Sequence, residues 1–331
     1  MLGKRACKRA MTRLDMLDSQ PVGRFAPSPT GDLHVGSALA ALAAWASARA
    51  QGGRFVVRIE DLDGPRVVPG ASERQLAALR RLGLAWDGPV VRQSRRGAAY
   101  DAALVRLAGL GQLFACRRSR ADLAALASAP HSPDGPPYPA AWRTPSLGRD
   151  ALAGINGAAI REAAIRFRVE PGVVRFSDRV QGEIAEDVAS TVGDVVLRRR
   201  DGVVAYQLAV VVDDAAAGVT EVVRGADLLG STARQIQIAR ALGVSVPAYA
   251  HVPLIVAASG EKLSKRDGAL SVDALLDAGV SVDALVGWLA GVLGQGDAPR
   301  PAAAVAEAFD WPRVPRGPVV VADDLAAVLR G

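Results

Sequence analysis

The stretch RFAPSPTGDLHVGS, from Arg24 to Ser37, sets prolines, glycines and one histidine directly before a long alanine-rich run. This order predicts a strand over residues 22–25, a tight turn, and a helix that begins near His34 and continues over residues 37–49. His34 and Gly36 would then lie at the helix N-terminus, where backbone N–H groups and the helix dipole favour phosphate. Because Gly36 has no side chain, a nucleotide base can lie close to the backbone there.

A second polar segment, KLSKR from Lys262 to Arg266, lies far along the chain. Its two lysines, Lys262 and Lys265, suit the stabilisation of charge that builds up on a phosphate during its transfer. Each segment alone is a weak signal, because H-x-G-S and K-x-S-K also occur by chance. Their combination, in this order and at this separation, is the specific feature.

Strands and helices alternate between the two segments. A β-branched strand over residues 55–59 ends at the acidic turn that begins with Glu60, and helical apolar spacing follows over residues 72–82 and 96–110. This alternation predicts an α/β fold with a parallel sheet and right-handed crossovers. Ligands should bind at the carboxyl ends of the strands, where Arg24 and Glu60 fall.

The middle of the chain is less regular. Residues 129–145 are rich in proline, and strand character resumes over residues 164–169, so residues 116–161 resemble an insertion between two halves of the fold. Runs over residues 195–197 and 203–208 flank Asp201-Gly202, which predicts a hairpin. The predicted division of the chain is a disordered tail (1–20), a first catalytic half (21–115), the insertion (116–161), a second half with the KLSKR segment (162–270) and a short helical C-terminal segment (271–331), in which one apolar helix should cover residues 274–293.

Composition narrows the class of protein. The chain has 331 residues, and no run approaches the ~18 uninterrupted apolar residues of a membrane span. Residues 1–20 lack the apolar core of a secretory signal. Two cysteines, Cys7 and Cys116, cannot form a disulfide framework and suit a reducing compartment, so we expect a cytoplasmic protein without membrane contact. A net charge of +6 is compatible with a nucleic-acid partner but does not require one.

Four further motifs carry a family resemblance. They are RIEDLD at residues 58–63, AYQLAVVVDD at 205–214, GVTEVVRGADLLGSTARQ at 218–235 and YAHVPLI at 249–255. With the two segments above, they resemble the class I aminoacyl-tRNA synthetases, specifically the glutamyl branch. Within that branch the chain is most similar to the glutamyl-Q tRNA(Asp) synthetases over residues 21–275. The resemblance implies a Rossmann-like nucleotide-binding fold with an inserted small domain.

The resemblance also implies a two-step reaction. ATP, accompanied by Mg²⁺, would activate L-glutamate to glutamyl-adenylate without tRNA, and glutamate would then pass to queuosine at the wobble position of tRNA(Asp). The partner would be the anticodon stem-loop, and we expect a monomer. His34, Gly36, Lys262 and Lys265 would be the catalytic residues, with Lys262 the weaker assistant. ATP would be bound by His34, Gly36, Ser37 and Lys265.

The same resemblance implies a glutamate pocket. Arg24 is the first candidate to hold the γ-carboxylate, because a guanidinium pairs with a carboxylate in a bidentate manner. Arg224 is the second candidate, and Glu60 would contact the ammonium group. The other implied members are Phe25, Ala26, Pro27, Ser28 and Tyr206. Simpler roles remain open: His34 can cap a helix, Glu60 can cap the next element, and Tyr206 can pack in an alternating strand.

The chain departs from many relatives at their structural zinc site. Where the family carries further cysteines, this chain has Arg118 and Trp142, so that Cys116 is the one family cysteine ligand present. A structural site needs four suitable ligands, and Cys116, Tyr138 and His131 do not make a convincing set. We therefore expect no bound metal, and packing around Trp142 in its place.

Two alternatives to the main hypothesis stay open. A full glutamyl-tRNA synthetase continues into a helical anticodon-reading module, which the residues after Gly268 are too few to build. The chain could nevertheless be a truncated glutamyl-tRNA synthetase, or a non-catalytic synthetase-like binding module. Arg198 to Arg200 has two interpretations as well: a solvated hairpin edge that discourages aggregation, or a contact to the RNA backbone.

Overall fold

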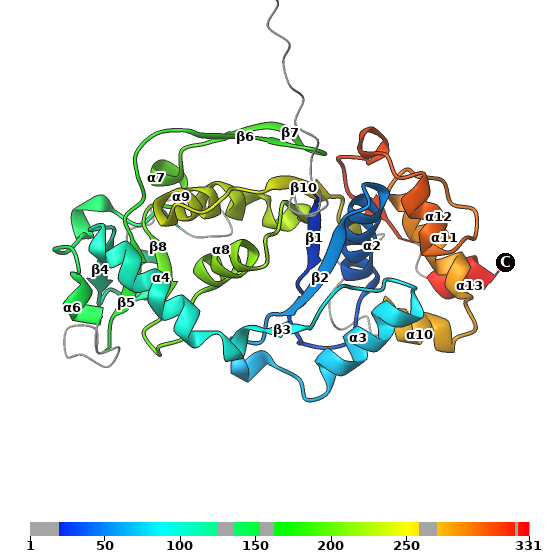
Figure 1. The fold of residues 1–331 in the computed structure, drawn as a ribbon, viewed down its shortest axis with the longest axis horizontal. Coiled ribbons are helices and arrows are strands. Elements are labelled where there is room, and N and C mark those ends of the chain that lie inside the picture. Colours follow the sequence, from blue (N-terminus) through cyan, green and yellow to red (C-terminus); the bar gives the residue numbers. More distant parts are fainter. Residues whose placement is uncertain (1–19, 125–135, 153–161, 258–269, 322–323, 331) are drawn as a thin grey trace, which may run out of the picture.

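A seven-stranded sheet forms the centre of the computed structural model, which describes residues 20–124, 136–152, 162–257, 270–321 and 324–330 (Figure 1). The strand order is β3-β2-β1-β9-β10-β6-β7. These strands are β1 (Val22–Phe25), β2 (Arg54–Ile59), β3 (Val91–Arg92), β6 (Val174–Asp178), β7 (Gly182–Glu186), β9 (Glu221–Gly225) and β10 (Ala248–Val252). Each neighbouring pair is parallel except β6 and β7.

The longer helices cover both faces of this sheet. They are α2 (Val35–Ala50), α3 (Ala71–Arg81), α4 (Gly97–Gly109), α8 (Tyr206–Ala216), α9 (Thr232–Leu242) and α11 (Val282–Val292). Successive strand residues point to opposite faces. Accordingly, Phe25 and Val223 join one core with α2 and α11, while Val22 and Val222 join a second core with α4, α8 and α9. The predicted α/β fold with a parallel sheet is confirmed.

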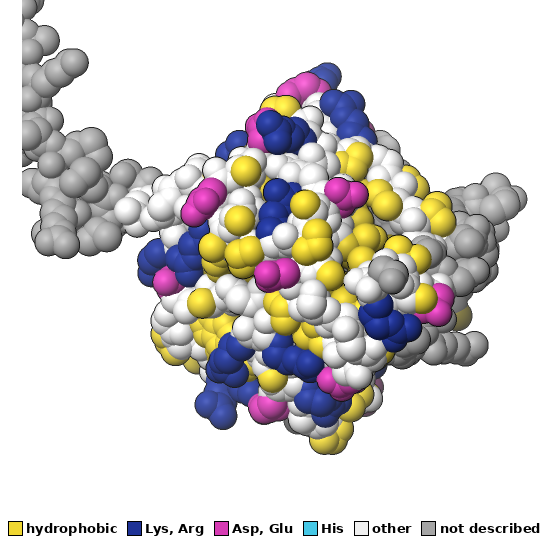
Figure 2. Space-filling model, turned by 90° about the vertical axis from the view of Figure 1, so that its right-hand side faces the viewer, with side chains coloured by type: hydrophobic (Ala, Val, Ile, Leu, Met, Phe, Trp, Pro, Cys, Tyr) yellow, Lys and Arg dark blue, Asp and Glu magenta, His cyan; other side chains and the backbone are white. Residues whose placement is uncertain are grey.

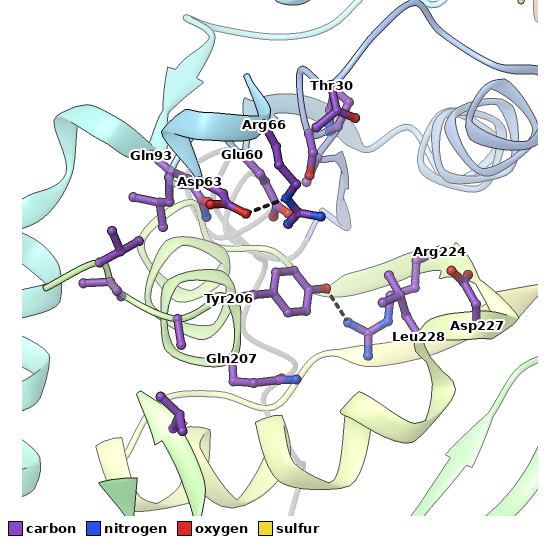
Figure 3. Close-up of a pocket in the computed structure, with 18 of the residues that line it drawn as sticks. Thr30, Glu60, Asp63, Arg66, Gln93, Tyr206, Gln207, Arg224, Asp227 and Leu228 are labelled. Atoms are coloured by element: carbon purple, nitrogen blue, oxygen red, sulfur yellow. Dashed lines mark hydrogen bonds and ion pairs between the residues drawn. The ribbon is translucent and has the colours of Figure 1, made fainter. Parts of the chain in front are cut away.

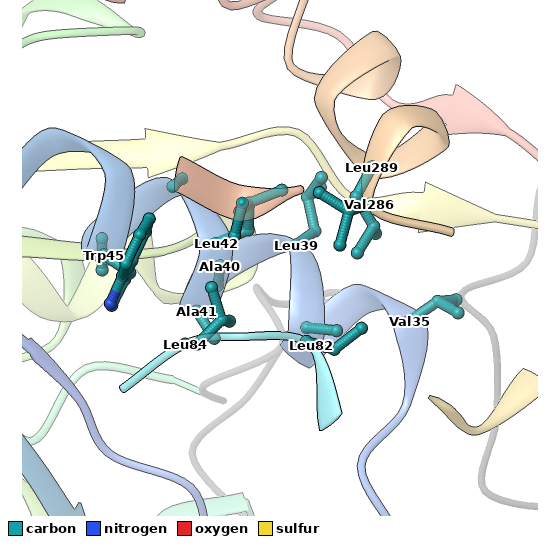
Figure 4. Packing of buried hydrophobic residues seen from close by; sticks show 14 of the residues in the cluster. Val35, Leu39, Ala40, Ala41, Leu42, Trp45, Leu82, Leu84, Val286 and Leu289 are labelled. Carbon is teal, nitrogen blue, oxygen red and sulfur yellow. The ribbon is translucent and has the colours of Figure 1, made fainter. Parts of the chain in front are cut away.

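The alanine-rich helix α2 is the centre of the first core. Its residues are buried on every side, from Val35 through Leu39 and Leu42 to Trp45. A helix that is apolar all round is stable only when other elements surround it. Figure 4 shows Leu82 and Leu84 packing on one side of it, and Val286 and Leu289 of α11 approaching from another. The alanines allow these close approaches and hold the helix N-terminus in a fixed place.

A separate three-stranded antiparallel sheet lies at one end of the molecule (Figure 1). It joins β4 (Leu113–Cys116), β5 (Ala164–Phe167) and β8 (Val195–Arg198). The short helices nearby are α5 (Arg120–Ala124), α6 (Arg149–Leu152) and α7 (Val188–Thr191). The strand expected to resume at Ala164 is therefore present, but it belongs to this small sheet.

The remaining elements gather at the opposite end. They are α10 (Val272–Asp277), α12 (Ala302–Glu307), α13 (Leu325–Arg330) and a parallel pair formed by β11 (Ile255–Val256) and β12 (Val319–Val320). Figure 2 shows this face, on which arginine and acidic side chains are interspersed with small apolar patches. Among the described residues, no helix combines the length and apolar character needed to cross a membrane.

Two element predictions are wrong. Residues 206–216 form helix α8 where a strand over residues 203–208 was expected, so Tyr206 is the first residue of a helix. The valine-rich run favours a strand locally, but its burial against α4 and α9 selects a helix. The single helix expected over residues 274–293 is two helices, α10 and α11. Gly279 has a left-handed φ of 91°, which ends the first helix, and the Ser281 hydroxyl caps the second by accepting from the N–H of Ala284.

Candidate active site

A large cleft opens at the carboxyl ends of the central strands, with a volume of about 2240 Å³. Small-molecule pockets are typically ~300–1,000 Å³, so this cleft has room for more than an amino acid and a nucleotide. Most predicted site residues line it: Arg24, Phe25, Ala26, Pro27, Ser28, His34, Gly36, Ser37, Glu60, Tyr206 and Arg224. Lys262 and Lys265 lie outside the described residues. Figure 3 shows how Glu60, Tyr206 and Arg224 face the same space.

The segment after β1 is held by main-chain contacts. The N–H of Glu60 donates to the carbonyl of Pro27 at 2.9 Å, and the Gln75 amide donates to the carbonyls of Ser28 and Gly31 at 3.2 and 2.7 Å. Gln75 is buried. These bonds fix the proline-rich turn against β2 and α3, so that the turn presents its backbone to the cleft in one conformation.

The N-terminus of α2 has the geometry expected of a nucleotide site. His34 is the N-cap residue in an extended conformation, and its carbonyl accepts from Ala38 N–H at 2.9 Å. A Cβ at Gly36 would meet no atom within 4 Å, so this position is open towards the cleft. The first N–H groups of a sixteen-residue helix are available to phosphate. These features fit ATP.

The two signature segments approach each other through described residues. Ser271, directly after the region that contains KLSKR, forms a β-bridge with His34, and the N–H of Val272 donates to the carbonyl of Leu33 at 2.8 Å. The chain therefore returns to the N-terminus of α2 on leaving that region. The roles of Lys262 and Lys265 stay predictions.

Arg24 is a buried arginine that retains donors for a ligand. It is 3% exposed, and its Nη1 donates to the carbonyl of Val223 at 2.6 Å, while Asp214 lies 3.7 Å from its Nε. Burial lowers the pKa of Arg24, and Asp214 opposes that shift. Among the described residues, the Nη2 group has no hydrogen-bond partner in this arrangement. A carboxylate in the cleft can take these N–H groups.

A buried ion network that the sequence did not reveal supports the acidic side of the pocket. Arg58 donates from Nη1 to Asp214 at 2.5 Å and from Nη2 to Glu60 at 3.1 Å. Burial acts to lower the pKa of Arg58, but Asp214 and Glu60 outweigh it and the pKa is raised. Burial raises the pKa of Glu60, and the charge of Arg58 opposes that rise. Asp214 thus links Arg24 to Arg58, and Arg58 orients Glu60.

The neighbouring Asp213 anchors α8 to α4 in the same region. It accepts from Gln93 at 2.9 Å, from Nε of Arg96 at 2.7 Å and from the hydroxyl of Tyr100 at 2.7 Å. Both aspartates end the motif AYQLAVVVDD, yet neither was assigned a role from the sequence. The sequence signal for this network is the presence of charged residues inside the apolar sequences of β2 and α8. Such residues are buried only when they are paired.

Arg224 forms the other polar wall of the cleft. This residue is 5% exposed and donates to Tyr206 at 3.2 Å, Gln235 at 2.8 Å, Thr232 at 2.8 Å and His251 at 2.9 Å. Burial raises the pKa of Tyr206, although the charge of Arg224 opposes this shift. Tyr206 remains a neutral hydroxyl that points across the cleft towards Arg224 (Figure 3).

A small aromatic cluster occupies the region of the family's zinc site. The Tyr138 hydroxyl lies 3.3 Å from Cys116 Sγ and 3.2 Å from the carbonyl of Trp142, and the two rings meet edge to face. The Arg118 guanidinium stacks 5.0 Å from the Trp142 ring. Within the described parts of the chain, no group of three or more His, Cys, Asp or Glu side chains could hold a metal ion. His131 lies outside them.

Two arginines beside the Asp201-Gly202 turn lie on the surface of the cleft. Arg199 pairs with Asp201 at 2.6 Å and reaches Asp63, on the opposite wall, at 3.3 Å. Arg200 donates to the carbonyl of Arg117 at 2.5 Å. Both arginines are exposed and line the cleft. A solvated edge and an RNA contact are both compatible with this position.

Comparison with known proteins identifies the family to which this chain belongs. The family model for the catalytic domain of class I tRNA synthetases (E and Q) matches residues 22–290. The chain belongs to this class of ligases, whose chemistry uses ATP.

The curated relatives narrow the class. A glutamyl-Q tRNA(Asp) synthetase of Geobacter sulfurreducens is 54% identical over 76% of this chain and 78% of its own length. One of Nocardia farcinica is 48% identical over 91% of this chain and 93% of its own length. Within the class, the chain belongs to the glutamyl-Q tRNA(Asp) synthetase family. A glutamate tRNA ligase of Elizabethkingia meningosepticum, solved with its amino acid, has a TM-score of 0.79 at 26% identity and matches 94% of this chain and 69% of its own.

Proposed function

We propose that this enzyme activates L-glutamate with ATP in the absence of tRNA, and transfers the glutamyl group to queuosine at the wobble position of tRNA(Asp). The observation that carries the proposal is the convergence of Arg24, Glu60, Tyr206 and Arg224 beside the open N-terminus of α2. Cationic and anionic groups for an amino acid thus lie next to a site for phosphate. The proposed acceptor, queuosine in tRNA(Asp), is taken from the names of the relatives.

In the first step, the α-carboxylate of glutamate attacks the α-phosphorus of ATP, and pyrophosphate leaves. This chemistry needs positioning and charge stabilisation more than covalent help. The backbone at His34 and Gly36 would hold phosphate, and Lys265 would meet the negative charge that develops, with Lys262 assisting. Mg²⁺ would arrive with the phosphates of ATP.

Selection of glutamate needs opposite charges at its two ends. Arg24 would hold the γ-carboxylate, because it lines the cleft and its Nη2 group has no acceptor among the described residues. Glu60, which Arg58 orients, would hold the ammonium group. Tyr206 and Arg224 would close the pocket from α8 and β9.

In the second step, a hydroxyl of the cyclopentene ring of queuosine would attack the carbonyl carbon of the adenylate. The ester bond forms as AMP leaves, and the hydroxyl proton is released. The size of the cleft supports entry of an anticodon loop, and the exposed arginines at its mouth, Arg199 and Arg200, are suited to phosphate.

The test combines two measurements. Pyrophosphate exchange with ATP and glutamate, without RNA, should be observed, and labelled glutamate should then pass to a synthetic tRNA(Asp) anticodon stem-loop that carries queuosine. The same loop with guanosine is the matched control and should stay unlabelled. Exchange that is silent until whole tRNA(Glu) is added would instead identify a glutamyl-tRNA synthetase, and no exchange under any condition would identify a non-catalytic module.

A further inference from the structure

A buried histidine contacts Arg224, and it is not among the residues that line the cleft. His251 in β10 is fully buried, and its Nε2 atom accepts from Nε of Arg224 at 2.9 Å. Its Nδ1 atom lies 2.6 Å from Oδ2 of Asp178, the last residue of β6. The three side chains form one chain of hydrogen bonds that runs from β6, next to the edge strand β7, to the cleft.

The carboxylate of Asp178 can take only one orientation. Its Oδ1 atom accepts three backbone N–H groups, from Val180 at 3.0 Å, Gln181 at 2.8 Å and His251 at 3.1 Å. Oδ2 is thereby directed at the imidazole. Burial would raise the pKa of Asp178, but the bonds from His251 and the backbone outweigh it and the pKa is lowered. Asp178 is therefore an ionised acceptor, and Nδ1 of His251 must carry the proton.

A second contact is compatible with the same tautomer. Oγ1 of Thr232 accepts from Nη2 of Arg224 at 2.8 Å and lies 3.3 Å from Nε2 of His251. Its own hydroxyl proton can be donated to this nitrogen. The Nε donor of Arg224 needs a lone pair on Nε2, which only the Nδ1–H form of the neutral imidazole provides, and the Thr232 hydroxyl can donate to the same atom.

We propose that Asp178 and His251 are positioning residues for Arg224, and that they set the guanidinium orientation required to select the amino acid. This inference rests on the proposed function in one respect, because it takes Arg224 to be part of the glutamate pocket. Asp178 fixes the tautomer, the imidazole presents its lone pair to Nε, and the guanidinium plane is held with Nη1 beside Tyr206.

Acid should release this arrangement. A proton on Nε2 would turn this atom from an acceptor into a donor, so that it would face the donors of Arg224 and Thr232. The imidazolium would also place a positive charge beside the Arg224 guanidinium. The charged and titratable groups around the ring are Asp178 from β6, Arg224 from β9, Tyr249 from β10 and, further away, Arg24 from β1. Burial lowers the pKa of His251, although the bond to Asp178 opposes that shift, so the neutral ring is favoured at pH 7.

Two amide substitutions separate the two contacts of the ring. His251→Asn retains a donor near Nδ1 for Asp178 and removes the acceptor of Arg224, whereas His251→Gln places an amide near Nε2 and gives up Asp178. His251→Asn should raise the glutamate KM about ten- to hundredfold, with kcat and the ATP KM changed by less than about threefold. His251→Gln should raise the glutamate KM less, and it should reduce the rise in KM expected in acid to the part that protonation of Glu60 causes.

The tautomer can be read directly by nitrogen NMR of the imidazoles, since the chain has only three histidines. The signals missing from His251→Gln identify this residue, which should carry its proton on Nδ1 at pH 7. An Nε2–H tautomer would overturn the proposal. So would equal effects of both substitutions on glutamate KM, ATP KM and melting temperature, because these would indicate a purely structural role.

The outcome also separates this inference from the proposed function. If the wild-type enzyme lacks glutamate-dependent pyrophosphate exchange, the proposed function fails. The tautomer then decides alone whether Asp178 and His251 hold Arg224.

Discussion

Arg24 and Arg224 are both buried at the carboxyl ends of neighbouring strands, but they use their N–H groups differently. Arg224 donates four hydrogen bonds to protein side chains. Arg24 donates one, to a carbonyl, and pairs loosely with Asp214. A guanidinium has five N–H donors, so Arg24 has more of them available to a substrate. At the residue scale, we therefore expect Arg24 to be the principal carboxylate ligand and Arg224 to be held more rigidly by the protein.

This difference predicts the behaviour of Arg24→Gln. The amide can still donate to the carbonyl of Val223, but the charge that meets the γ-carboxylate is lost. We expect the preference for glutamate over glutamine to fall by about ten- to hundredfold, since hydrogen bonds to charged groups contribute ~1.5–3 kcal/mol. Pyrophosphate exchange with each amino acid measures the ratio, and the ATP KM serves as the control. Retained preference for glutamate would shift this role to Arg224.

Glu60 gives a prediction with a defined dependence on pH. Because burial raises the pKa of Glu60 in the folded protein, the folded state binds this proton more tightly than the unfolded chain. Its contribution to stability therefore falls as pH rises from the ordinary glutamate pKa through the raised one. As pH falls through that same range, Glu60 loses the charge that meets the ammonium group, and the glutamate KM should rise.

Glu60→Gln separates these two effects. The amide oxygen can still accept from Arg58, and the cost of a buried charge disappears, so the melting temperature at pH 7 should be unchanged or higher. The glutamate KM should rise by roughly tenfold or more. Calorimetry and pyrophosphate exchange on the same preparation test both. A lower melting temperature with unchanged KM would contradict the role of Glu60 in binding.

Lys265 is predicted to act on the transition state of activation. Lys265→Ala should lower the rate of adenylate formation by ~10² or more, because one preorganised electrostatic partner typically contributes ~3–4 kcal/mol there. Glutamate affinity should stay nearly intact, and Lys262→Ala should have the smaller effect. Single-turnover measurement of pyrophosphate release separates rate from binding. An unchanged rate with a raised glutamate KM would show that Lys265 binds glutamate instead.

At the scale of elements, the small antiparallel sheet depends on the contacts of Tyr138. Its ring packs against Phe114 and Trp142, Arg166 stacks on it at 4.0 Å, and its hydroxyl lies beside Cys116. This cluster packs the part of the chain where the family resemblance would place a zinc ion. Bound structural zinc would contribute to folding directly, whereas ring packing contributes through burial.

The aromatic cluster leads to a paired prediction. Tyr138→Phe should lower stability by about 1 kcal/mol, or a few degrees in melting temperature, through loss of the hydroxyl contacts. The wild-type protein should contain no stoichiometric zinc, and a chelator should leave its melting temperature unchanged without ATP. Elemental analysis and thermal unfolding provide the measurements. About one zinc per chain would show that the interpretation of Arg118 and Trp142 is wrong.

At the scale of the whole molecule, the cleft is where an RNA would meet the catalytic residues. If Arg199 and Arg200 contact phosphates, each substitution by glutamine should weaken binding of the stem-loop and reduce the slope of log affinity against log salt by about 1. Arg54→Gln is a matched control, since Arg54 is exposed at the opposite, amino end of β2. Equal losses in all three variants would indicate only a general effect of net charge.

Local sequence order determined the framework of this protein. Motifs within short windows of the chain predicted the strand, turn and helix over residues 22–49 and the parallel sheet. They also gave the candidate positions Arg24, Glu60 and Arg224. Their signals are local because a tight turn, a helix N-terminus and a strand end depend on neighbouring residues. The domain boundaries and the lysine roles stay predictions.

Tertiary structure decided which residues pair with and orient the side chains at those positions. Residues 206–216 are a helix because two others bury them, and Arg58 is paired because α8 brings Asp214 to it. Asp178 reaches His251 because β6 pairs with β10 in the register that places Tyr249 opposite Asp178. Such pairings between distant residues depend on sheet register and burial, which no short window of sequence contains. The sequence by itself thus predicted residues that line one cleft, and only the folded chain determined how their charges are paired.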